Sequence, residues 1–196
     1  MLEIILASQN QGKVDELITY LRDKSLSLIL APENLQVAET GETFQQNALI
    51  KAATYYDKLQ RPVLSDDSGL CLDAFPEMMG VDTANYRSDL KNYQDKCRAL
   101  LEFFEDKKET NRKASFVCHL CLYFSPKEIF FFEGVMHGNI SLDILGNTGF
   151  GYDPIFIPEG KSETLAQLPD WKKEHSHRAK SAKGLRDFLL NQRQRD

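Results

Sequence analysis

Two adjacent carboxylates stand in the run Ser65-Asp66-Asp67-Ser68-Gly69, directly after the short apolar segment Val63–Ser65. This segment is expected to be a strand, and ligands in α/β sheets gather at the carboxyl ends of strands. Paired carboxylates there are costly unless a positive charge neutralises them, and Mg²⁺ is a natural partner of carboxylate and phosphate oxygens. The run therefore predicts a metal site, with a helix cap and a solvated aspartate as the alternative.

A polar turn, Ser8-Gln9-Asn10-Gln11-Gly12-Lys13, follows the first apolar segment of the chain. A turn from strand to helix presents backbone N–H groups and the positive end of a helix at one spot, and the Ser8, Asn10 and Lys13 side chains add donors and a charge. Neither a P-loop nor a GxGxxG dinucleotide turn is present. The turn predicts a phosphate site, and an ordinary polar helix cap is the alternative.

A third group of candidates begins in the polar loop Glu39-Thr40-Gly41 and continues into the helix that follows it. Asn47 and Lys51 are four residues apart and share one face of that helix. Glu39 is a candidate metal ligand and Lys51 a candidate phosphate contact. Taken singly, each could also be a plain surface residue.

Downstream, the segment Gly149-Phe150-Gly151-Tyr152-Asp153-Pro154 combines glycines, aromatic rings and a carboxylate. Glycines permit close approach of the backbone to a ligand, and an aromatic ring can stack on a nucleobase. Lys172 and the run Ser176-His177-Arg178 add donors near the start of the last predicted helix. The alternatives are a turn with core aromatics and a solvated helix cap.

The elements that must position these residues follow from apolar periodicity and turn signals. Leu2–Ala7, Lys13–Leu21 and Ser25–Ala31 predict a β-α-β start with parallel pairing. Thr43 is expected to begin a capping box for a helix that runs to about Leu59. The other predicted elements are a helix over Tyr93–Phe104, a hairpin of Ala114–Phe124 and Glu128–His137, a third strand over Asn139–Asp143, and a final helix over about Ser176–Gln192 with Ser176 as its N-cap. The expected fold is α/β, a mixed sheet flanked by helices, with two lobes sharing one long sheet.

The composition, 42% hydrophobic and 27% charged over 196 residues, supports one sizeable core and argues against disorder. We expect a single domain over residues 1–196. A formal net charge of −5 disfavours general binding to nucleic acid. No apolar stretch is long enough to span a membrane, and no secretory signal is visible, so a soluble cytoplasmic protein is expected.

The cysteines Cys118 and Cys121 have the CxxC spacing of metal and redox sites. They lie in the predicted strand Ala114–Phe124, where residues three apart point to opposite faces. We therefore expect buried, reduced thiols that act as small hydrophobes.

Taken together and in order, these segments resemble the motifs of the inosine triphosphate pyrophosphatase family. Each motif alone is modest, but five in register across nearly the whole chain are highly specific. The matching patterns are (S/T)-x-N-x-x-K at Ser8, Asn10 and Lys13; E-x-G at Glu39-Thr40-Gly41, followed by N-A-x-x-K-A from Asn47 to Ala52; D-D-S-G-L from Asp66 to Leu70; G-F-G-Y-D-P from Gly149 to Pro154; and K followed five residues later by H-R at Lys172 and His177-Arg178.

The resemblance implies an elongated fold with a central substrate cleft between two lobes, a homodimer, and Mg²⁺-dependent hydrolysis of ITP, dITP and XTP to the monophosphate and pyrophosphate. It assigns Asp67 as the base that activates water, and Glu39 with Asp67 as the metal site. The residues that it implies for phosphate binding are Ser8, Gln9, Asn10, Gln11, Gly12, Lys13, Lys51 and Ser68, and those for base binding are Phe150, Gly151, Tyr152, Asp153, Lys172, His177 and Arg178.

Base selectivity is expected from hydrogen-bond donors, because hypoxanthine and xanthine carry a carbonyl oxygen where adenine carries an amine. Arg178 is an expected donor to that oxygen. The sequence departs from the family pattern at a few positions, none of them a proposed base or metal ligand: Gln9 and Thr148 stand where Gly is common, Gln46 where Glu is common, Asn85 where the triplet Ala-Arg-Tyr has Arg, and Lys173 where Asn is frequent. The Asn85 and Lys173 changes leave substrate preference and turnover open.

Two alternatives remain at this level. A Maf-like pyrophosphatase acting on modified pyrimidine triphosphates also opens with a strand, a polar turn and a helix, but the Gly-Phe-Gly-Tyr-Asp and Ser-His-Arg segments argue against it. A nucleotide-binding regulator without catalysis is disfavoured by the intact Asp66 and Asp67.

Overall fold

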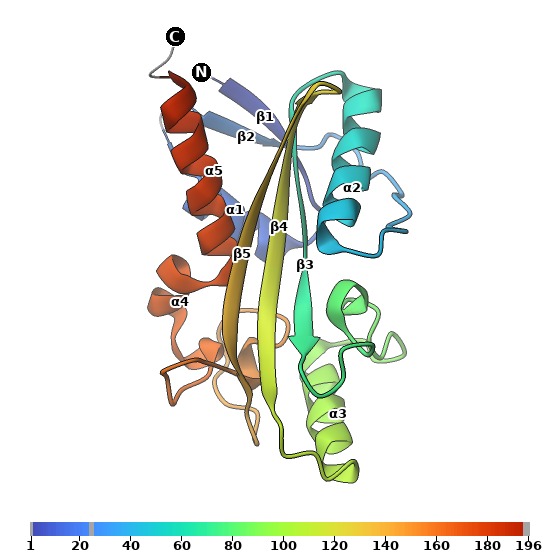
Figure 1. Ribbon diagram of the computed structural model, residues 1–196, viewed down its shortest axis with the longest axis vertical. Coiled ribbons are helices and arrows are strands. Elements are labelled where there is room, and N and C mark those ends of the chain that lie inside the picture. Colours follow the sequence, from blue (N-terminus) through green and yellow to red (C-terminus); the bar gives the residue numbers. More distant parts are fainter. Residues whose placement is uncertain (1, 24–25, 194–196) are drawn as a thin grey trace. The chain divides into compact units, whose positions relative to one another are not determined.

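A computed structural model describes residues 2–23 and 26–193 of the chain. Six strands form one mixed sheet in the order β2-β1-β3-β4-β5-β6, and five α-helices flank it, so the predicted α/β class is confirmed (Figure 1). The described strands and α-helices are β1 (Leu2–Ala7), α1 (Gln11–Tyr20), β2 (Leu26–Leu30), α2 (Phe44–Leu59), β3 (Val63–Leu72), α3 (Tyr93–Asp106), β4 (Lys113–Ser125), β5 (Glu128–Ile140), β6 (Phe156–Pro158), α4 (Pro169–His175) and α5 (His177–Arg193).

The chain divides into two compact units. The first contains residues from 1–68, 118–134 and 177–196, and the second contains residues 69–117 and 135–176. Strands β3, β4 and β5 each contribute residues to both units. The expected substrate cleft and the single functional domain over residues 1–196 stay predictions.

The first unit is built on β1, which pairs in parallel with β2 on one side and with β3 on the other. Helices α1 and α5 cover one face of its strands, and α2 covers the other (Figure 1). Both faces of β1 are therefore buried from Ile4 onward, which explains its continuous apolar run from Ile4 to Ala7. Alternate residues enter different cores: Ile4 and Leu6 pack toward α1 and α5, whereas Ile5 and Ala7 pack toward α2.

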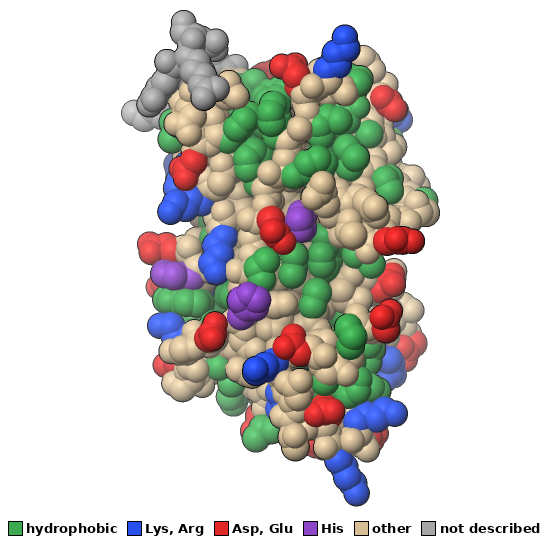
Figure 2. Space-filling view, viewed as in Figure 1, with side chains coloured by type: hydrophobic (Ala, Val, Ile, Leu, Met, Phe, Trp, Pro, Cys, Tyr) green, Lys and Arg blue, Asp and Glu red, His purple; other side chains and the backbone are tan. Residues whose placement is uncertain are grey.

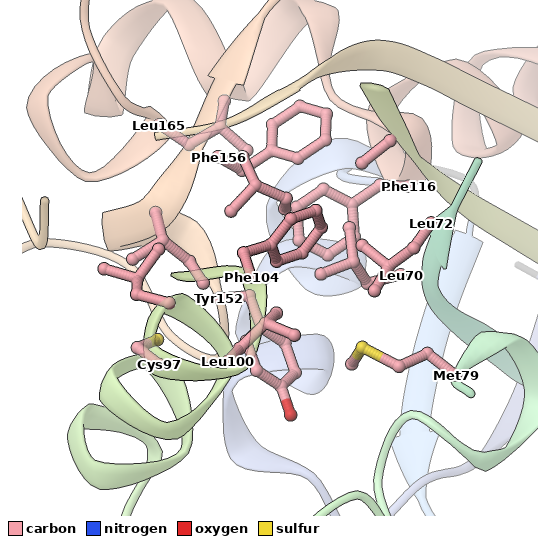
Figure 3. Close-up of a cluster of buried hydrophobic side chains, with 14 of the residues drawn as sticks. Leu70, Leu72, Met79, Cys97, Leu100, Phe104, Phe116, Tyr152, Phe156 and Leu165 are labelled. Atoms are coloured by element: carbon pink, nitrogen blue, oxygen red, sulfur yellow. The ribbon is translucent and has the colours of Figure 1, made fainter. Parts of the chain in front are cut away.

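The second unit has its own core, formed by one side of α3, the second half of β3 and aromatic side chains from later in the chain (Figure 3). The predicted helix over Tyr93–Phe104 is confirmed by α3, in which Cys97, Leu100, Leu101 and Phe104 are all buried. Tyr152 belongs to this core as well, with only 2% of its surface exposed.

Several predicted elements are confirmed. Strand β1 has the predicted bounds, the β-α-β start pairs in parallel, and α2 begins after the N-cap Thr43, whose Oγ1 accepts the Gln46 N–H at 3.2 Å. The second half of the capping box differs, because the Gln46 side chain accepts the N–H of Glu42 at 2.7 Å and not that of Thr43. Ser25, the first residue of a predicted strand, lies outside the described residues.

Other predicted bounds were wrong. Strand β3 runs to Leu72, so the acidic run lies inside a strand and not after its end. The run begins where the pairing with β1 ends, at Ala7 opposite Ser65. No separate strand covers 139–143 in the described chain, because β5 extends through Ile140 without a break. Strand β6 and helix α4 were not predicted, since each is shorter than the windows in which periodicity can be recognised.

The two CxxC cysteines behave as predicted. All four cysteines are free, and Cys118 lies in the core shared with α5 while Cys121 lies in the core shared with α2. Burial raises the pKa of each of these two thiols to about 12, so both stay protonated at neutral pH.

None of the helices in the described part of the chain combines the length and apolar character needed to cross a bilayer. On the face drawn in Figure 2, acidic and basic side chains are interspersed.

Candidate active site

Asp66 is the electrostatic centre of the first unit's polar cluster, with only 1% of its surface exposed. Its Oδ1 lies 3.0 Å from Lys13 Nζ, and its Oδ2 accepts hydrogen bonds of 3.2 Å from both Nε and Nη2 of Arg178. Burial opposes ionisation, but Lys13, Arg178 and Lys51 outweigh it and hold the pKa of Asp66 well below its usual range. Asp66 is therefore a permanent buried anion whose oxygens face basic side chains of the same unit.

Asp67 differs from its neighbour although it is also buried, with 5% of its surface exposed. Its Oδ1 accepts the N–H of Ser68 at 2.9 Å, and its Oδ2 is buried without a hydrogen-bond partner among the described residues. Burial raises the pKa, Lys13 and Lys51 lower it, and Asp66 and Glu39 raise it, with a net rise from 3.8 to about 6. A carboxylate with that pKa is mostly ionised at neutral pH and can still take up a proton.

Lys51 links the loop before α2 to the acidic strand. Its Nζ lies 2.6 Å from Glu39 Oε1 and donates a 2.9 Å hydrogen bond to the backbone oxygen of Asp66. Burial lowers the pKa of Lys51, but Asp66, Glu39 and Asp67 outweigh it, so the pKa is raised and the side chain stays charged. The structure thus brings together three residues that the sequence assigned to phosphate and metal: Lys51, Glu39 and Asp67.

The polar turn at residues 8–13 leads into the N-terminus of α1, as predicted. Asn10 is the N-cap, and its Oδ1 accepts the N–H of Lys13 at 3.2 Å. Gln9, Asn10 and Gln11 are exposed, while Ser8, Gly12 and Lys13 are half-buried. The turn is therefore a helix cap and also presents a positive helix end beside the Lys13–Asp66 ion pair, so the two interpretations of its sequence are compatible.

Arg178 is buried, with 1% of its surface exposed, and every nitrogen of its guanidinium donates to a protein acceptor. Besides the two bonds to Asp66, Nη1 lies 2.6 Å from Glu16 Oε2 and Nη2 lies 2.7 Å from Ser68 Oγ. Burial lowers the pKa of Arg178, but Asp66, Cys118 and Glu16 reverse this and raise it. The guanidinium therefore ties α5 to both α1 and β3.

Sequence analysis missed Glu16. It follows Lys13 by three residues on α1, and both face the acidic strand, Lys13 through Asp66 and Glu16 through Arg178. The spacing of three residues was a visible signal, because residues three apart share a helix face. The spacing alone did not reveal the role of Glu16, because its partner Arg178 lies 162 residues away in the chain.

The second unit holds the predicted base-binding segment around Asp153. Asp153 Oδ2 accepts the N–H of Phe150 at 2.9 Å and lies 2.6 Å from Lys172 Nζ, in a pair that is almost fully buried. The Lys172 ammonium also lies 4.6 Å from the centroid of the Phe150 ring, within the range of a cation–π contact. Asp153 and Lys172 together fix the conformation of Phe150.

Glycine is required beside this pair. Gly149 has a φ of +77°, and a Cβ there would lie 2.1 Å from Asp153 Oδ2. Gly151 has a φ of +64°, and its carbonyl oxygen is 3.6 Å from the Cys97 sulfur. Tyr152 is a core residue whose ring makes an edge contact with Tyr93, so its aromatic ring serves packing. Phe150 is half-buried, so it is the aromatic residue of this segment whose ring is partly exposed.

His177 begins α5 in the first unit and is 5% exposed. Its backbone oxygen packs against Gly134 of β5 so closely that a Cβ at that glycine would lie 1.9 Å from it. The predicted base-binding residues are therefore divided, with His177 and Arg178 in the first unit and Phe150, Gly151, Tyr152, Asp153 and Lys172 in the second.

The residues present fit Mg²⁺. Asp67 offers a buried oxygen that has no hydrogen-bond partner among the described residues, and Glu39 is close enough to raise the pKa of Asp67. Among residues 2–23 and 26–193 no group of three or more His, Cys, Asp or Glu side chains forms a complete protein cage. Two carboxylates without a cage suit Mg²⁺, which keeps several waters and binds through one or two carboxylates together with substrate phosphates.

The chain is an α/β protein in which buried acidic residues of β3 face basic residues from three helices, and comparison with known proteins identifies the family. The model of the Ham1 family matches residues 4–188, so the chain belongs to the Ham1 family. A dITP/XTP pyrophosphatase from Aquifex aeolicus is 36% identical over 200 residues, covering 97% of this chain and 98% of the relative. Another from Acholeplasma laidlawii is 37% identical over 191 residues, covering 96% and 92%. The resemblance found in the sequence motifs is thereby confirmed.

Solved structures agree with this assignment. A HAM1 protein from Coxiella burnetii superimposes with a TM-score of 0.87 at 34% identity, covering 97% of this chain and 100% of the other. The Ham1 protein of Staphylococcus aureus gives a TM-score of 0.85 at 33% identity, covering 97% and 99%. Membership in this family removes the ground for the Maf-like alternative.

Proposed function

We propose that the chain hydrolyses non-standard purine nucleoside triphosphates, including ITP, dITP and XTP, to the monophosphate and pyrophosphate, and so cleanses the nucleotide pool. The observation that carries the proposal is Asp67, a buried carboxylate with a raised pKa and one oxygen without a partner, beside Lys13 and Lys51. Membership in the Ham1 family and the names of the relatives support the substrate class.

The triphosphate is held by positive groups of the first unit. Lys13, Lys51 and the N-terminus of α1 lie beside the acidic strand, and charge-assisted hydrogen bonds to phosphate are the stronger kind. Ser8, Gln9, Asn10, Gln11 and Gly12 supply polar side chains and backbone donors around that helix end, and Ser68 a hydroxyl. In the free protein Lys13 pairs with Asp66 and Lys51 pairs with Glu39, so both ammonium groups are already held beside the acidic strand when the phosphates bind.

Glu39 and Asp67 are the residues that would hold Mg²⁺. When bound, the ion would neutralise phosphate charge and make a water molecule a better nucleophile. Asp67 accepts the proton of the water that attacks the α-phosphate, because its buried Oδ2 has no hydrogen-bond partner among the described residues. Asp66 keeps its negative charge throughout, because Lys13 and Arg178 hold its pKa low, and it anchors Lys13 and Arg178.

The base is recognised by the second group of predicted residues. Phe150 offers a ring for stacking, and the buried Lys172–Asp153 pair supports it through a cation–π contact and the Phe150 N–H. Gly151, Tyr152, His177 and Arg178 complete the proposed set. A site built of donors accepts the carbonyl of hypoxanthine or xanthine and rejects the amine of adenine, because a mismatched donor would be left without a partner.

We further propose that the enzyme acts as a cytoplasmic homodimer. Free, reduced cysteines suit the cytoplasm, and the dimer rests on the family resemblance alone. Sedimentation equilibrium of the purified protein tests the dimer, and a monomer over the working concentration range would remove it.

The function is tested by incubating the protein with Mg²⁺ and a panel of triphosphates that includes dITP, XTP, ATP, GTP and a modified pyrimidine triphosphate, with identification of every product. The proposal predicts monophosphate plus pyrophosphate from dITP and XTP, with ATP processed far more slowly. Release of orthophosphate, or saturable binding without any product, would overturn it.

A further inference from the structure

Asn47 is a buried amide on α2 that no proposed step uses. Only 2% of its surface is exposed, and its Oδ1 accepts the N–H of Gly41 at 2.7 Å. Gly41 lies two residues after Glu39, in the loop that precedes the helix. The contact therefore connects the helix that carries Lys51 to the loop that carries Glu39.

The loop has little room to move at this point. A Cβ on Gly41 would lie 2.6 Å from Gln46 Cβ and 2.7 Å from Asn47 Oδ1, so the glycine is needed for close approach. The next backbone N–H, that of Glu42, donates to Gln46 Oε1 at 2.7 Å. Two consecutive N–H groups are thus bound by two consecutive side chains of α2.

Glu39 is fixed to the same helix by a second contact, its ion pair of 2.6 Å with Lys51. In the proposed function this ion pair cannot persist, because Glu39 turns to the cation and Lys51 turns to the phosphates. The hydrogen bond from Gly41 to Asn47 involves neither charge and can persist when the ion pair is broken. Together with the hydrogen bond from Glu42 to Gln46, it then keeps the Glu39 loop on α2.

We propose that Asn47 is a positioning residue that holds Glu39 in place for the divalent cation, an inference that rests on the proposed function. Asn47 itself touches neither substrate nor cation in this role. Outer partners that orient a metal ligand typically change metal affinity by about 10-fold to 100-fold when they are removed. Loss of the Asn47 amide should therefore weaken cation binding by about 10-fold or more.

A purely structural role must be distinguished, because an unpaired buried N–H destabilises a protein wherever it lies. Thr83 provides a matched control in the second unit. It is 8% exposed, and its hydroxyl accepts the N–H of Leu70 at 2.9 Å and donates to the oxygen of the same residue at 3.1 Å. Thr83→Ala also removes a buried side-chain hydrogen bond, without touching the Glu39 loop.

The experiment titrates Mn²⁺ into the full chain by calorimetry in the absence of nucleotide, and measures the Mg²⁺ concentration for half-maximal dITP hydrolysis. Asn47→Ala and Gly41→Ala should both raise the Mn²⁺ Kd and this Mg²⁺ concentration by about 10-fold or more, while Thr83→Ala lowers the melting temperature and leaves both constants near the wild-type values. Asn47→Asp, which keeps an acceptor for the Gly41 N–H, should restore Mn²⁺ binding. Should Asn47→Ala fail to fold, Gly41→Ala carries the same test.

Equal Mn²⁺ affinity in wild type, Asn47→Ala and Gly41→Ala would overturn the inference, as would a wild-type protein that binds no Mn²⁺. Failure of the proposed function is a separate result. In that case wild type releases no pyrophosphate from dITP or XTP, while the Mn²⁺ titration still decides the role of Asn47.

Discussion

Lys51 and Glu39 form an ion pair of 2.6 Å at the point where the proposed enzyme must bind two opposite charges, a cation and a triphosphate. The same ammonium donates to the backbone oxygen of Asp66 at 2.9 Å. In the free protein the Lys51 ammonium and the Glu39 carboxylate neutralise each other. Binding of a magnesium–triphosphate complex then exchanges one ion pair for two new ones, so little charge is left unpaired at any stage.

If the Lys51–Glu39 ion pair opens when substrate binds, replacement of Lys51 should strengthen cation binding and weaken nucleotide binding. Lys51→Met keeps the length of the side chain and removes the charge that competes for Glu39. Binding of Mn²⁺ alone should tighten, while the KM for dITP should rise, because a phosphate contact worth about 1.5–3 kcal/mol is lost. Calorimetry and steady-state kinetics measure the two constants.

Lys58→Met is the control, since Lys58 lies on the same helix as Lys51 and makes an exposed ion pair of 2.6 Å with Glu33. Both constants should stay at the wild-type values in that variant. If Lys51→Met weakened cation binding and nucleotide binding together, the exchange would be ruled out.

Asp67→Asn should nearly abolish turnover, while binding of dITP survives through Lys13 and Lys51. The amide is the same size but cannot accept the proton from water, and loss of a general base typically costs about 100-fold to 10,000-fold in rate. Rapid-quench measurement of dITP hydrolysis and equilibrium binding of dITP provide the two readouts. A variant with near-normal rate would remove Asp67 as the base.

Asp67 should also make the stability of the metal-free protein depend on pH. The pKa of Asp67 is about 6 in the folded protein and 3.8 ordinarily, so between these pH values the folded state binds more protons than the unfolded state. The contribution of Asp67 to the free energy of unfolding therefore falls as the pH rises from about 4 to about 6. A shift of this size is worth about 3 kcal/mol at pH above 7. Urea unfolding with a chelator present should therefore show Asp67→Asn to be more stable than wild type at pH 8, with the difference shrinking toward pH 4. A difference independent of pH would contradict the raised pKa.

Arg178→Ala should destabilise the first unit in addition to any effect on recognition of the base. It leaves Asp66 and Glu16 without their cation, and removal of one member of a buried pair costs about 3–5 kcal/mol. We expect a lower melting temperature and, because Arg178 is a proposed donor to the base carbonyl, a larger loss of activity on dITP than on ATP. Losses of equal size on both triphosphates would contradict base recognition by Arg178.

Much of this site could be predicted from the sequence, because its groups lie in short segments with recognisable turn and cap signals. Thr43 caps the helix that it was expected to cap, and Asn10 caps α1 in the turn where a polar cap was the alternative. Lys51 lies close enough to Asp67 to lower its pKa. The role of Asp66 was harder to see. Its environment depends on Arg178, which is 112 residues away, and no local pattern carries that information.

The extent of β3 was misjudged for a physical reason as well. Asp66, Asp67 and Gly69 are poor strand formers, so propensity predicted that the strand would end at Ser65. Tertiary contacts override this preference: Ser65 donates to the backbone of α2, Asp66 is held by Lys13 and Arg178, and Leu70 is held by Thr83. A strand that contains two buried carboxylates is a local conflict of the kind that functional sites produce.

The central claim is that water attacks the α-phosphate of a non-standard purine triphosphate. Hydrolysis of dITP in water enriched in the heavy isotope of oxygen, followed by mass spectrometry of both products, tests it most directly. We predict one heavy oxygen in the monophosphate and none in the pyrophosphate. Heavy oxygen in the pyrophosphate, or the appearance of orthophosphate in its place, would contradict the account.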